Sequence, residues 1–271
     1  MPMQGVSKPF TAVILAADRE TPDPVAQSAA VRCKALAPVD GKPMVARVLN
    51  ALSASTEVSE SILCGPDRAI VDCEPFLQEL LQAESVQWMP SRNTPSTSAY
   101  DVLQQLPADQ PVLLTTADHA LLRPAIVDHF CHEARLSGCD VVIGLASYEA
   151  VMAAYPGMRR TATRFADGPF CGCNLFSFLT PQSRAAADFW RQVERDRKKP
   201  LKMLNKLGWI AVLKYLLGAL SLTDGLDRIS RRLGLRAGAV ILPFPEAAVD
   251  VDTPADWQFV QGLSGRQHSR N

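Results

Sequence analysis

Cationic side chains gather around the helix start that follows the first apolar stretch of the chain. Residues 11–17 form a short apolar run, and the polar loop after it carries Arg32, Lys34 and Lys42. Such a run is typical of a fully buried parallel strand. The loop therefore leaves from the carboxyl end of the strand, where the N–H groups of a following helix bind anions. Three cations around one helix start predict a phosphate-binding site.

Aspartates stand in a similar position later in the chain. Residues 112–116 predict another buried strand, and Asp118 comes directly after it. Since the carboxyl ends of parallel strands share one edge of a sheet, Asp118 is expected beside the first loop. Asp250 and Asp252 belong to an acidic strand end near the C-terminus. The residues alone leave an alternative, in which each aspartate only caps the helix that follows it.

Strand and helix patterns alternate along most of the chain, which predicts an α/β fold with a single doubly wound, mainly parallel sheet. Further strands are predicted at 61–65, 86–89, 140–146 and 237–242. Helices are predicted to end near Ala54 and to run over 75–83, 124–136 and 181–197. Two more helices are expected, one after a cap at Ser96 or Ser98 and one at 223–233 after a cap at Thr223. One domain over 1–263 is expected, with a helical insertion at about 184–235 in the C-terminal third. A disordered tail is expected at 264–271.

Composition gives no support for a nucleic-acid-binding, secreted or membrane-spanning protein. Lys plus Arg and Asp plus Glu number 28 each, so bulk charge gives no argument for a nucleic-acid partner. The N-terminus lacks the apolar core of a signal peptide, and no run of about 18 apolar residues is present. A cytoplasmic protein is expected, whose seven scattered cysteines are reduced.

Three segments resemble motifs of the GT-A-like nucleotidyltransferases, in particular the MobA-like group. They are K-A-L-A-P-V-D-G-K-P-M at 34–44, T-T-A-D-H at 115–119 and V-D-V-D-T-P-A-D-W at 249–257. The resemblance runs from about Phe10 to Phe259, leaves 184–235 unmatched, and implies a GT-A/Rossmann-like nucleotidyltransferase fold. Family members usually read L-A-G-G or L-A-A-G at the first loop, whereas this chain has Ala16, Ala17 and Asp18.

The resemblance implies an enzyme that moves an NMP from an NTP to a phosphorylated sugar, cofactor or lipid-like acceptor and releases pyrophosphate. It implies Mg²⁺ on Asp118 and Asp252, with Asp250 as the fallback ligand. It implies that the triphosphate is bound by Ala16, Ala17, Arg32 and Lys34. Ser96 or Ser98 would face the nucleotide base. The acceptor would be bound by Lys42, Arg160, Arg164 and Asn174. Two alternatives stay open: a non-catalytic nucleotide-binding protein of this fold, and a GT-A glycosyltransferase that uses a nucleotide-sugar.

Three further features have more than one interpretation. The basic and Leu/Trp-rich stretch 198–220 is interpreted as a buried helix of the insertion, as a peripheral membrane contact or as the lining of an acceptor groove. His129, Cys131 and His132 have a spacing that zinc could use, although no second ligand pair follows. Cys171 and Cys173 are interpreted as small packing residues, with a redox or metal role as the alternative.

Overall fold

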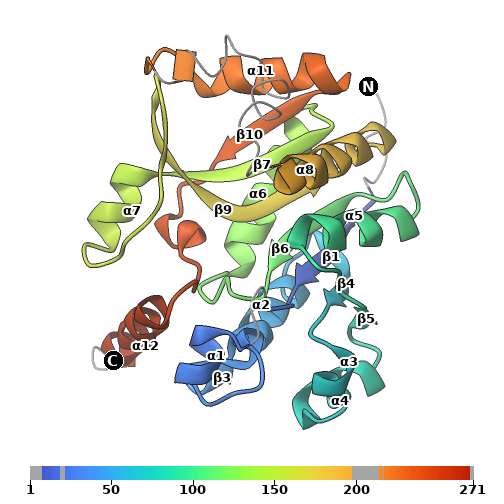
Figure 1. Cartoon of the computed structure of the whole chain (residues 1–271), viewed down its shortest axis with the longest axis vertical. Coiled ribbons are helices and arrows are strands. Elements are labelled where there is room, and N and C mark those ends of the chain that lie inside the picture. The colour runs from blue at the N-terminus through green and yellow to red at the C-terminus, as the bar shows by residue number, and fades with distance from the viewer. Residues whose placement is uncertain (1–7, 19–21, 197–213, 216, 269–271) are drawn as a thin grey trace.

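The sheet forms the centre of the molecule, as expected from the alternating pattern. The computed structural model describes residues 8–18, 22–196, 214–215 and 217–268. Its main sheet has eight strands, seven of them in the order β10-β7-β9-β6-β1-β4-β5, and β8 pairs with β9 (Figure 1). The strands are β1 (Phe10–Leu15), β4 (Val58–Cys64), β5 (Gln87–Met89), β6 (Val112–Thr116), β7 (Val141–Ser147), β8 (Thr163–Phe165), β9 (Gly168–Phe178) and β10 (Ala237–Ile241).

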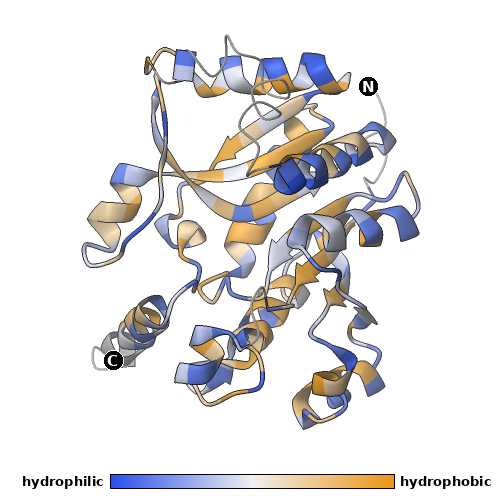
Figure 2. Ribbon diagram, in the orientation of Figure 1, coloured by the Kyte–Doolittle hydropathy of each residue, from blue (hydrophilic) through white to orange (hydrophobic). Residues whose placement is uncertain are grey.

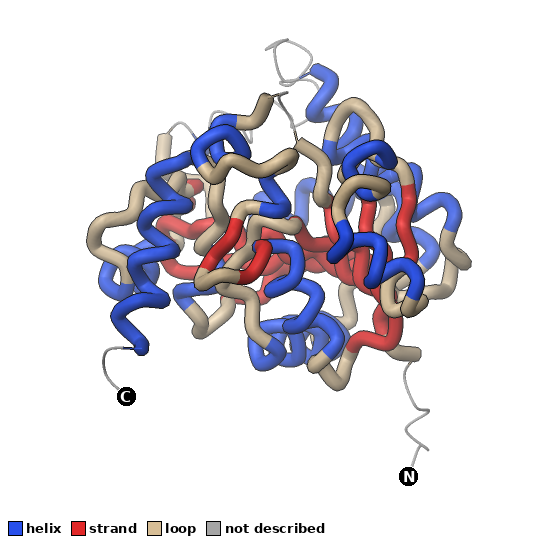
Figure 3. The backbone as a smooth tube through the Cα atoms, turned by 90° about the horizontal axis from the view of Figure 1, so that it is seen from below, coloured by secondary structure: helices blue, strands red, loops and turns tan. Residues whose placement is uncertain are grey.

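Helices cover the sheet on both faces, and the strands form a layer between them (Figure 3). They are α1 (Pro24–Ser28), α2 (Met44–Ser53), α3 (Arg68–Val71), α4 (Pro75–Gln82), α5 (Pro95–Gln105), α6 (Pro124–Leu136), α7 (Tyr148–Ala154), α8 (Arg184–Asp196), α11 (Leu222–Leu233) and α12 (Pro254–His268). Short 3₁₀ turns lie at Lys34–Leu36, Pro181–Ser183 and Pro245–Ala248, and a small hairpin joins β2 (Pro38–Val39) to β3 (Lys42–Pro43). None of the helices in these described ranges is long and apolar enough to cross a bilayer.

The packing of β1 explains why its sequence is apolar at every position except Thr11. Ala12 and Ile14 pack into one core cluster with α2 and α6, whereas Val13 packs into a second cluster with α5 and Ala187 of α8. Because successive side chains of a strand point to opposite faces, a strand covered on both faces must be apolar throughout. Colouring by hydropathy shows the same arrangement, with apolar strands inside and polar helix faces outside (Figure 2).

Strand β9 is the main difference from the expected sheet. The sequence indicated only short β-like pieces before residue 178, but β9 is a long strand that runs antiparallel to both β6 and β7. The pairing with β7 shifts register between Ile143 and Leu145, opposite a stretch of β9 that contains Asn174 at φ 49°. This is a β-bulge, a feature that redirects a side chain out of the regular strand pattern.

Several helix caps differ from those expected. Thr94, rather than Ser96 or Ser98, caps α5, because Pro95 occupies the first helical position. Ser221, rather than Thr223, caps α11. Arg123 is the N-cap residue of α6, so Asp118 does not cap that helix.

The final helix also differs from the expectation. Thr253 and Asp256 exchange hydrogen bonds at the start of α12, with Asp256 N–H donating to Thr253 Oγ1 at 3.2 Å and Thr253 Oγ1 donating to Asp256 Oδ2 at 2.7 Å. The helix continues to His268, whereas a disordered tail was expected from residue 264.

The described parts of the insertion are α8, the short pieces 214–215 and 217–221, and α11 with the residues that follow it. Helix α8 packs against α5, where the Arg191 guanidinium lies over the Tyr100 ring, and its Trp190 stacks on Phe176 of β9. Helix α11 packs against β10. Most of the stretch 198–220 lies outside the described residues.

Candidate active site

The ammonium of Lys34 lies between two aspartates from distant parts of the chain. Its Nζ is 2.5 Å from Asp118 Oδ2 and 3.7 Å from Asp252 Oδ1, and it donates to the Val251 carbonyl at 3.1 Å. We refer to these four groups as the Lys34 cluster. Only 16% of the Lys34 side chain and 9% of the Asp118 side chain are exposed, so the ion pair is largely withdrawn from water.

Three chain segments bring the cluster together. The loop after β1 supplies Lys34, whose backbone N–H donates to Asp18 Oδ1 at 3.0 Å. The carboxyl end of β6 supplies Asp118, and β6 lies next to β1 in parallel register. The segment before α12 is attached to β6 by its backbone, because Val251 N–H donates to the Asp118 carbonyl at 3.1 Å. The expected meeting of strand ends at one edge of the sheet is therefore found.

The cluster faces a cavity of about 400 Å³ at this edge. The cavity is lined mainly by the ends of β1 and β6 and by the loop around α1. Its lining residues are Leu15, Ala16, Ala17, Asp18, Asp23, Pro24, Lys34, Ala35, Pro95, Thr116, Ala117, Asp118 and Asp252. Among the residues that the structure describes, the lining includes four carboxylates and a single lysine, a balance that favours binding of a further cation.

The pKa shifts in the cluster agree with a charged pair. Burial alone would raise the pKa of Asp118, but the charge of Lys34 and the hydrogen bond from it outweigh burial and lower that pKa. Burial would lower the pKa of Lys34, and the Asp118 charge reverses this effect and raises it. Neighbouring His119 is buried, and this burial lowers its pKa to about 4, so its imidazole is neutral at physiological pH.

Asp118 has the properties of a metal ligand. Its carboxylate is buried, and its Oδ1 atom has no hydrogen-bond partner among the residues that the structure describes. A buried carboxylate oxygen is normally hydrogen-bonded or coordinates a cation. Asp252 lines the same cavity with a half-exposed side chain. Two carboxylates that leave room for waters and phosphate oxygens fit Mg²⁺, which rarely has an all-protein cage.

A family model for the MobA-like NTP transferase domain matches residues 12–235 of the chain, which include Lys34 and Asp118. The chain belongs to this family. It is therefore a nucleotidyltransferase, and its family implies an NTP substrate, a small-molecule acceptor and the use of a divalent metal. No curated protein matches the chain.

Solved structures of other transferases resemble this MobA-like protein. A hypothetical transferase from Thermus thermophilus is 31% identical, with a TM-score of 0.75 over 92% of this chain and 99% of the other. CMP:2-keto-3-deoxy-manno-octonic acid synthetase, solved with CTP, is 17% identical, with a TM-score of 0.55 over 95% and 99%. Molybdopterin-guanine dinucleotide biosynthesis protein A from Archaeoglobus fulgidus is 12% identical, with a TM-score of 0.52 over 95% and 100%. The last two show the fold alone.

The two serines expected at the base are engaged in fixing α5 and the segment before it. Ser98 Oγ accepts from the backbone N–H of Arg92 at 2.8 Å, and Ser96 Oγ donates to the Glu194 carboxylate. Both serines are buried, and neither lines the cavity, whereas Pro95 does. Glu194 was not singled out from the sequence, because a contact between residues 98 positions apart leaves no local signal.

The other expected cations lie outside the cavity of this nucleotidyltransferase. Arg32 pairs with Glu74 at 3.0 Å and is 60% exposed. Lys42 is exposed on the β2–β3 hairpin, and Arg164 is exposed on β8. Of the three cations at the first loop, only Lys34 lines the cavity.

Arg160 and Asn174 meet at Asp250 rather than at an open surface. The Arg160 guanidinium pairs with Asp250 Oδ1, and Asn174 Nδ2 donates to Asp250 Oδ2 at 2.6 Å. Arg160 and Asp250 are both nearly buried. The two expected acceptor residues therefore share one carboxylate partner next to Val251 and Asp252.

Asp18 and Asp23 are cavity residues that the sequence analysis did not single out. Burial raises the pKa of Asp18, while the backbone N–H of Lys34 opposes this rise and the charge of Asp23 adds to it. Asp23 caps α1 by accepting from Val25 N–H at 2.8 Å. The Asp23-Pro24 pair is a recognisable helix start, so this second aspartate had a readable signal.

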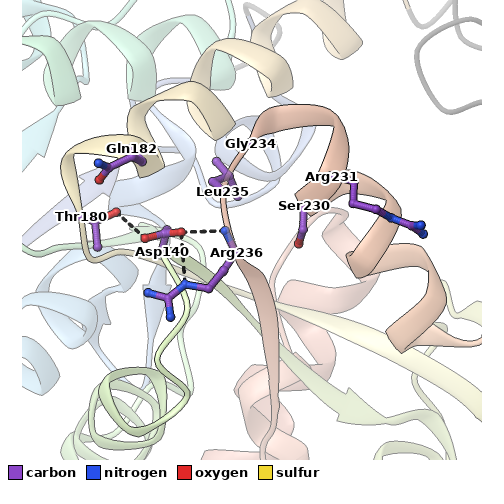
Figure 4. Close-up of a pocket in the computed structure, with 8 residues that line it drawn as sticks. All are labelled: Asp140, Thr180, Gln182, Ser230, Arg231, Gly234, Leu235 and Arg236. Atoms are coloured by element: carbon purple, nitrogen blue, oxygen red, sulfur yellow. Dashed lines mark hydrogen bonds and ion pairs between the residues drawn. The ribbon is translucent and has the colours of Figure 1, made fainter.

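A second, open pocket lies at the opposite edge of the sheet, where β7 and β10 begin (Figure 4). The Asp140 carboxylate in it accepts from the Arg236 backbone N–H at 2.6 Å and from Thr180 Oγ1 at 2.8 Å. Arg236 Nε lies 3.7 Å from the same carboxylate. These partners join the segments before β7 and β10, so Asp140 stabilises the fold.

The cysteine and histidine alternatives find no support in geometry. Cys171 and Cys173 are buried free thiols, and burial raises the pKa of each, so both are protonated. The His129 ring packs edge-on against Phe244. In the described part of the chain, no group of three or more His, Cys, Asp or Glu side chains is arranged to hold a metal.

Proposed function

We propose that the protein catalyses Mg²⁺-dependent transfer of an NMP from an NTP to a phosphorylated small-molecule acceptor, with release of pyrophosphate. The Lys34 cluster carries this proposal: one lysine and two aspartates meet in a cavity at the carboxyl edge of the sheet. This edge is where open α/β sheets bind their ligands.

Asp118 and Asp252 would hold the Mg²⁺ ion. Bound there, it would neutralise the charge on phosphate oxygens, which is its usual contribution to nucleotidyl and phosphoryl transfer. The unpartnered Oδ1 of Asp118 supports this assignment. The excess of carboxylates over lysine in the cavity supports it as well, because a tetraanionic NTP needs cations to enter such a site.

Lys34 would neutralise the phosphates that leave as pyrophosphate. Its raised pKa keeps it charged, and the bond from its backbone N–H to Asp18 fixes the loop that carries it. Ala16 and Ala17 follow β1 directly and line the cavity, where their backbone would approach a bound nucleotide. The protein therefore acts by orientation and charge neutralisation rather than by covalent chemistry.

A phosphorylated acceptor supplies its own nucleophilic oxygen and needs no general base. His119 is buried and does not line the cavity, and a pKa of about 4 makes it a weak proton acceptor, which agrees with this requirement. Arg164 supports a phosphate acceptor, because it is exposed on β8, and the β8–β9 hairpin pairs with the carboxyl end of β7 at Ser147. A guanidinium at this edge matches phosphate oxygens in a bidentate manner.

Thermal melting of the purified protein with ATP, CTP, GTP and UTP, each with and without Mg²⁺, tests the nucleotide part. A ligand at 100 times its dissociation constant adds about 2.7 kcal/mol to the free energy of unfolding. We expect one NTP to raise the melting temperature in a Mg²⁺-dependent way. No shift with any NTP, or equal shifts without Mg²⁺, would contradict the proposal.

Release of pyrophosphate tests the transfer itself. With the stabilising NTP present, addition of sugar phosphates, phosphorylated cofactor precursors or lipid phosphates should release pyrophosphate for one class of acceptor. Release of a nucleoside diphosphate from a nucleotide-sugar would identify a glycosyltransferase instead. Binding of NTP with no release for any acceptor class would favour the non-catalytic alternative.

A further inference from the structure

Asp250 is a nearly buried carboxylate whose two oxygens are both occupied. Oδ1 receives the Arg160 guanidinium, and Oδ2 receives Asn174 Nδ2 at 2.6 Å. Arg160 Nη1 also lies 3.5 Å from the backbone carbonyl of Asp250. Side-chain exposure is 11% for Arg160 and 12% for Asp250, so little of either group is left for a ligand.

The fold directs these two partners to Asp250 from separate elements. Asn174 lies in the bulge of β9 with φ at 49°, a left-handed conformation that asparagine adopts more readily than most residues. Arg160 comes from the connection between α7 and β8. Two long-range contacts with one side chain fix its position more firmly than either contact alone.

Asp250 is continuous with the catalytic segment. The next residue, Val251, donates its N–H to the Asp118 carbonyl and accepts Lys34 Nζ at its own carbonyl, each at 3.1 Å. The residue after it is Asp252, which lines the cavity with half of its side chain exposed. Asp252 lies between this attached pair of residues and α12, which begins at Pro254, so the attachment of residues 250 and 251 holds it from one side.

We propose that Asp250, held by Arg160 and Asn174, is a positioning residue that sets the place of Asp252 and thereby the affinity of the site for its divalent cation. This inference rests on the proposed function. It assigns Arg160 and Asn174 to the positioning of Asp252 and not to the acceptor phosphate. Residues that orient metal ligands typically change metal affinity by about 10- to 100-fold when they are replaced.

Binding of Mn²⁺ by the full chain, followed by electron paramagnetic resonance without nucleotide, which would itself chelate the ion, measures this effect without turnover. Asp250→Asn should raise the dissociation constant of Mn²⁺ by about 10-fold or more. The matched control is Asp140→Asn at the opposite edge. It removes a carboxylate that also has a backbone, a hydroxyl and an arginine partner, and it should leave Mn²⁺ binding unchanged.

A charge exchange distinguishes positioning from general loss of stability. Asp250→Asn combined with Asn174→Asp keeps one carboxylate, one amide and Arg160 in the cluster, and should recover part of the lost Mn²⁺ affinity. Recovery of stability without recovery of affinity, or equal losses in Asp250→Asn and Asp140→Asn, would overturn the inference. So would wild-type affinity in Asp250→Asn.

Failure of the proposed function gives a different result. If the site does not hold a divalent cation, wild-type protein and Asp118→Asn will both show no specific Mn²⁺ binding. If the wild type binds Mn²⁺ and Asp118→Asn does not, the cation site stands, and the Asp250→Asn result then decides the inference by itself.

Discussion

Replacement of Lys34 by methionine should destabilise the protein by leaving its aspartates without a counter-ion. Methionine fills a similar volume but removes the only lysine in the cavity lining, next to an Asp118 side chain that is 9% exposed. Breaking a buried pair from one side costs about 3–5 kcal/mol. For a domain of this size each kcal/mol shifts the melting temperature by about 2–4 °C, so a decrease of about 6–20 °C is expected.

The effect should depend on pH and on metal. In the wild type the lowered pKa of Asp118 contributes stability above the carboxyl's unfolded pKa, and this stability is lost as pH falls through the folded pKa. Without Lys34, burial raises the pKa of Asp118 instead. Protonation of Asp118 at low pH then removes the unpaired buried charge and makes the variant less unstable. The difference in melting temperature between Lys34→Met and wild type should therefore shrink from pH 8 to pH 4. At pH 8, Mg²⁺ should restore part of the stability, because it supplies positive charge to the same carboxylates.

Scanning calorimetry across this pH range, with and without Mg²⁺, measures both effects. Lys42→Met is the matched control, because Lys42 is exposed on the β2–β3 hairpin. This variant should have the melting temperature of the wild type. The reasoning is refuted if Lys34→Met melts like the wild type at pH 8, or if its deficit is the same at pH 4 and pH 8.

Three further substitutions test other parts of the site. Asp118→Asn should reduce pyrophosphate release by at least about 100-fold, whereas Asp109→Asn, at an exposed position, should not; an active Asp118→Asn variant would remove the metal assignment. Glu194→Ala should leave the buried N–H of Ser96 unpaired and leave Ser96 Oγ with Thr94 Oγ1 as its partner, which should cost about 1–3 kcal/mol and raise the KM for NTP. An unchanged KM would show that α8 does not influence nucleotide binding. Gly65→Ala should lower the free energy of unfolding, measured by calorimetry, by about 1–3 kcal/mol, because Gly65 has φ at 80° and its new Cβ would lie 3.0 Å from Ala17 N. Wild-type stability would show that the backbone at Ala17 can shift at little cost.

Several strands could be predicted because they form mainly apolar runs. β1, β6 and β7 were located within a few residues, since burial on both faces leaves a readable run. β9 was missed as a strand because its sequence is interrupted by Gly172 and by the bulge at Asn174, and its pairing with β6 and β7 is set by distant segments. Local patterns do not encode which strands are neighbours.

The same limit applies to the candidate site. Lys34, Asp118 and Asp252 were selected because they stand at the ends of apolar runs or in recognisable motifs, and the structure brings all three together. Arg32 shares the loop with Lys34 but pairs with Glu74, a partner 42 positions away that no spacing rule indicates. Residue type and proximity in sequence identify candidates, whereas long-range pairing decides which of them face the cavity.

The two described ends of the insertion are attached on one side of the molecule. Helix α8 ends beside the first turn of α5, where Glu194 meets Ser96, next to the cavity residue Pro95. The chain before α11 is attached to the β8–β9 hairpin, where the Leu220 carbonyl accepts from Ala166 N–H at 2.9 Å. That hairpin lies at the carboxyl end of β7, on the same edge as the Lys34 cluster.

In evolutionary terms, this arrangement gives the fold one place to vary. The segment between Asp196 and Leu220 is joined to the rest of the fold at the catalytic edge. A change in its length would therefore leave the Asp140 contacts, which join β7 and β10 at the opposite edge, undisturbed. We expect relatives with different acceptors to differ most in this interval and least in the three segments that form the Lys34 cluster. Comparison of segment lengths among relatives with known acceptors would test this, and equal variation in both regions would contradict it.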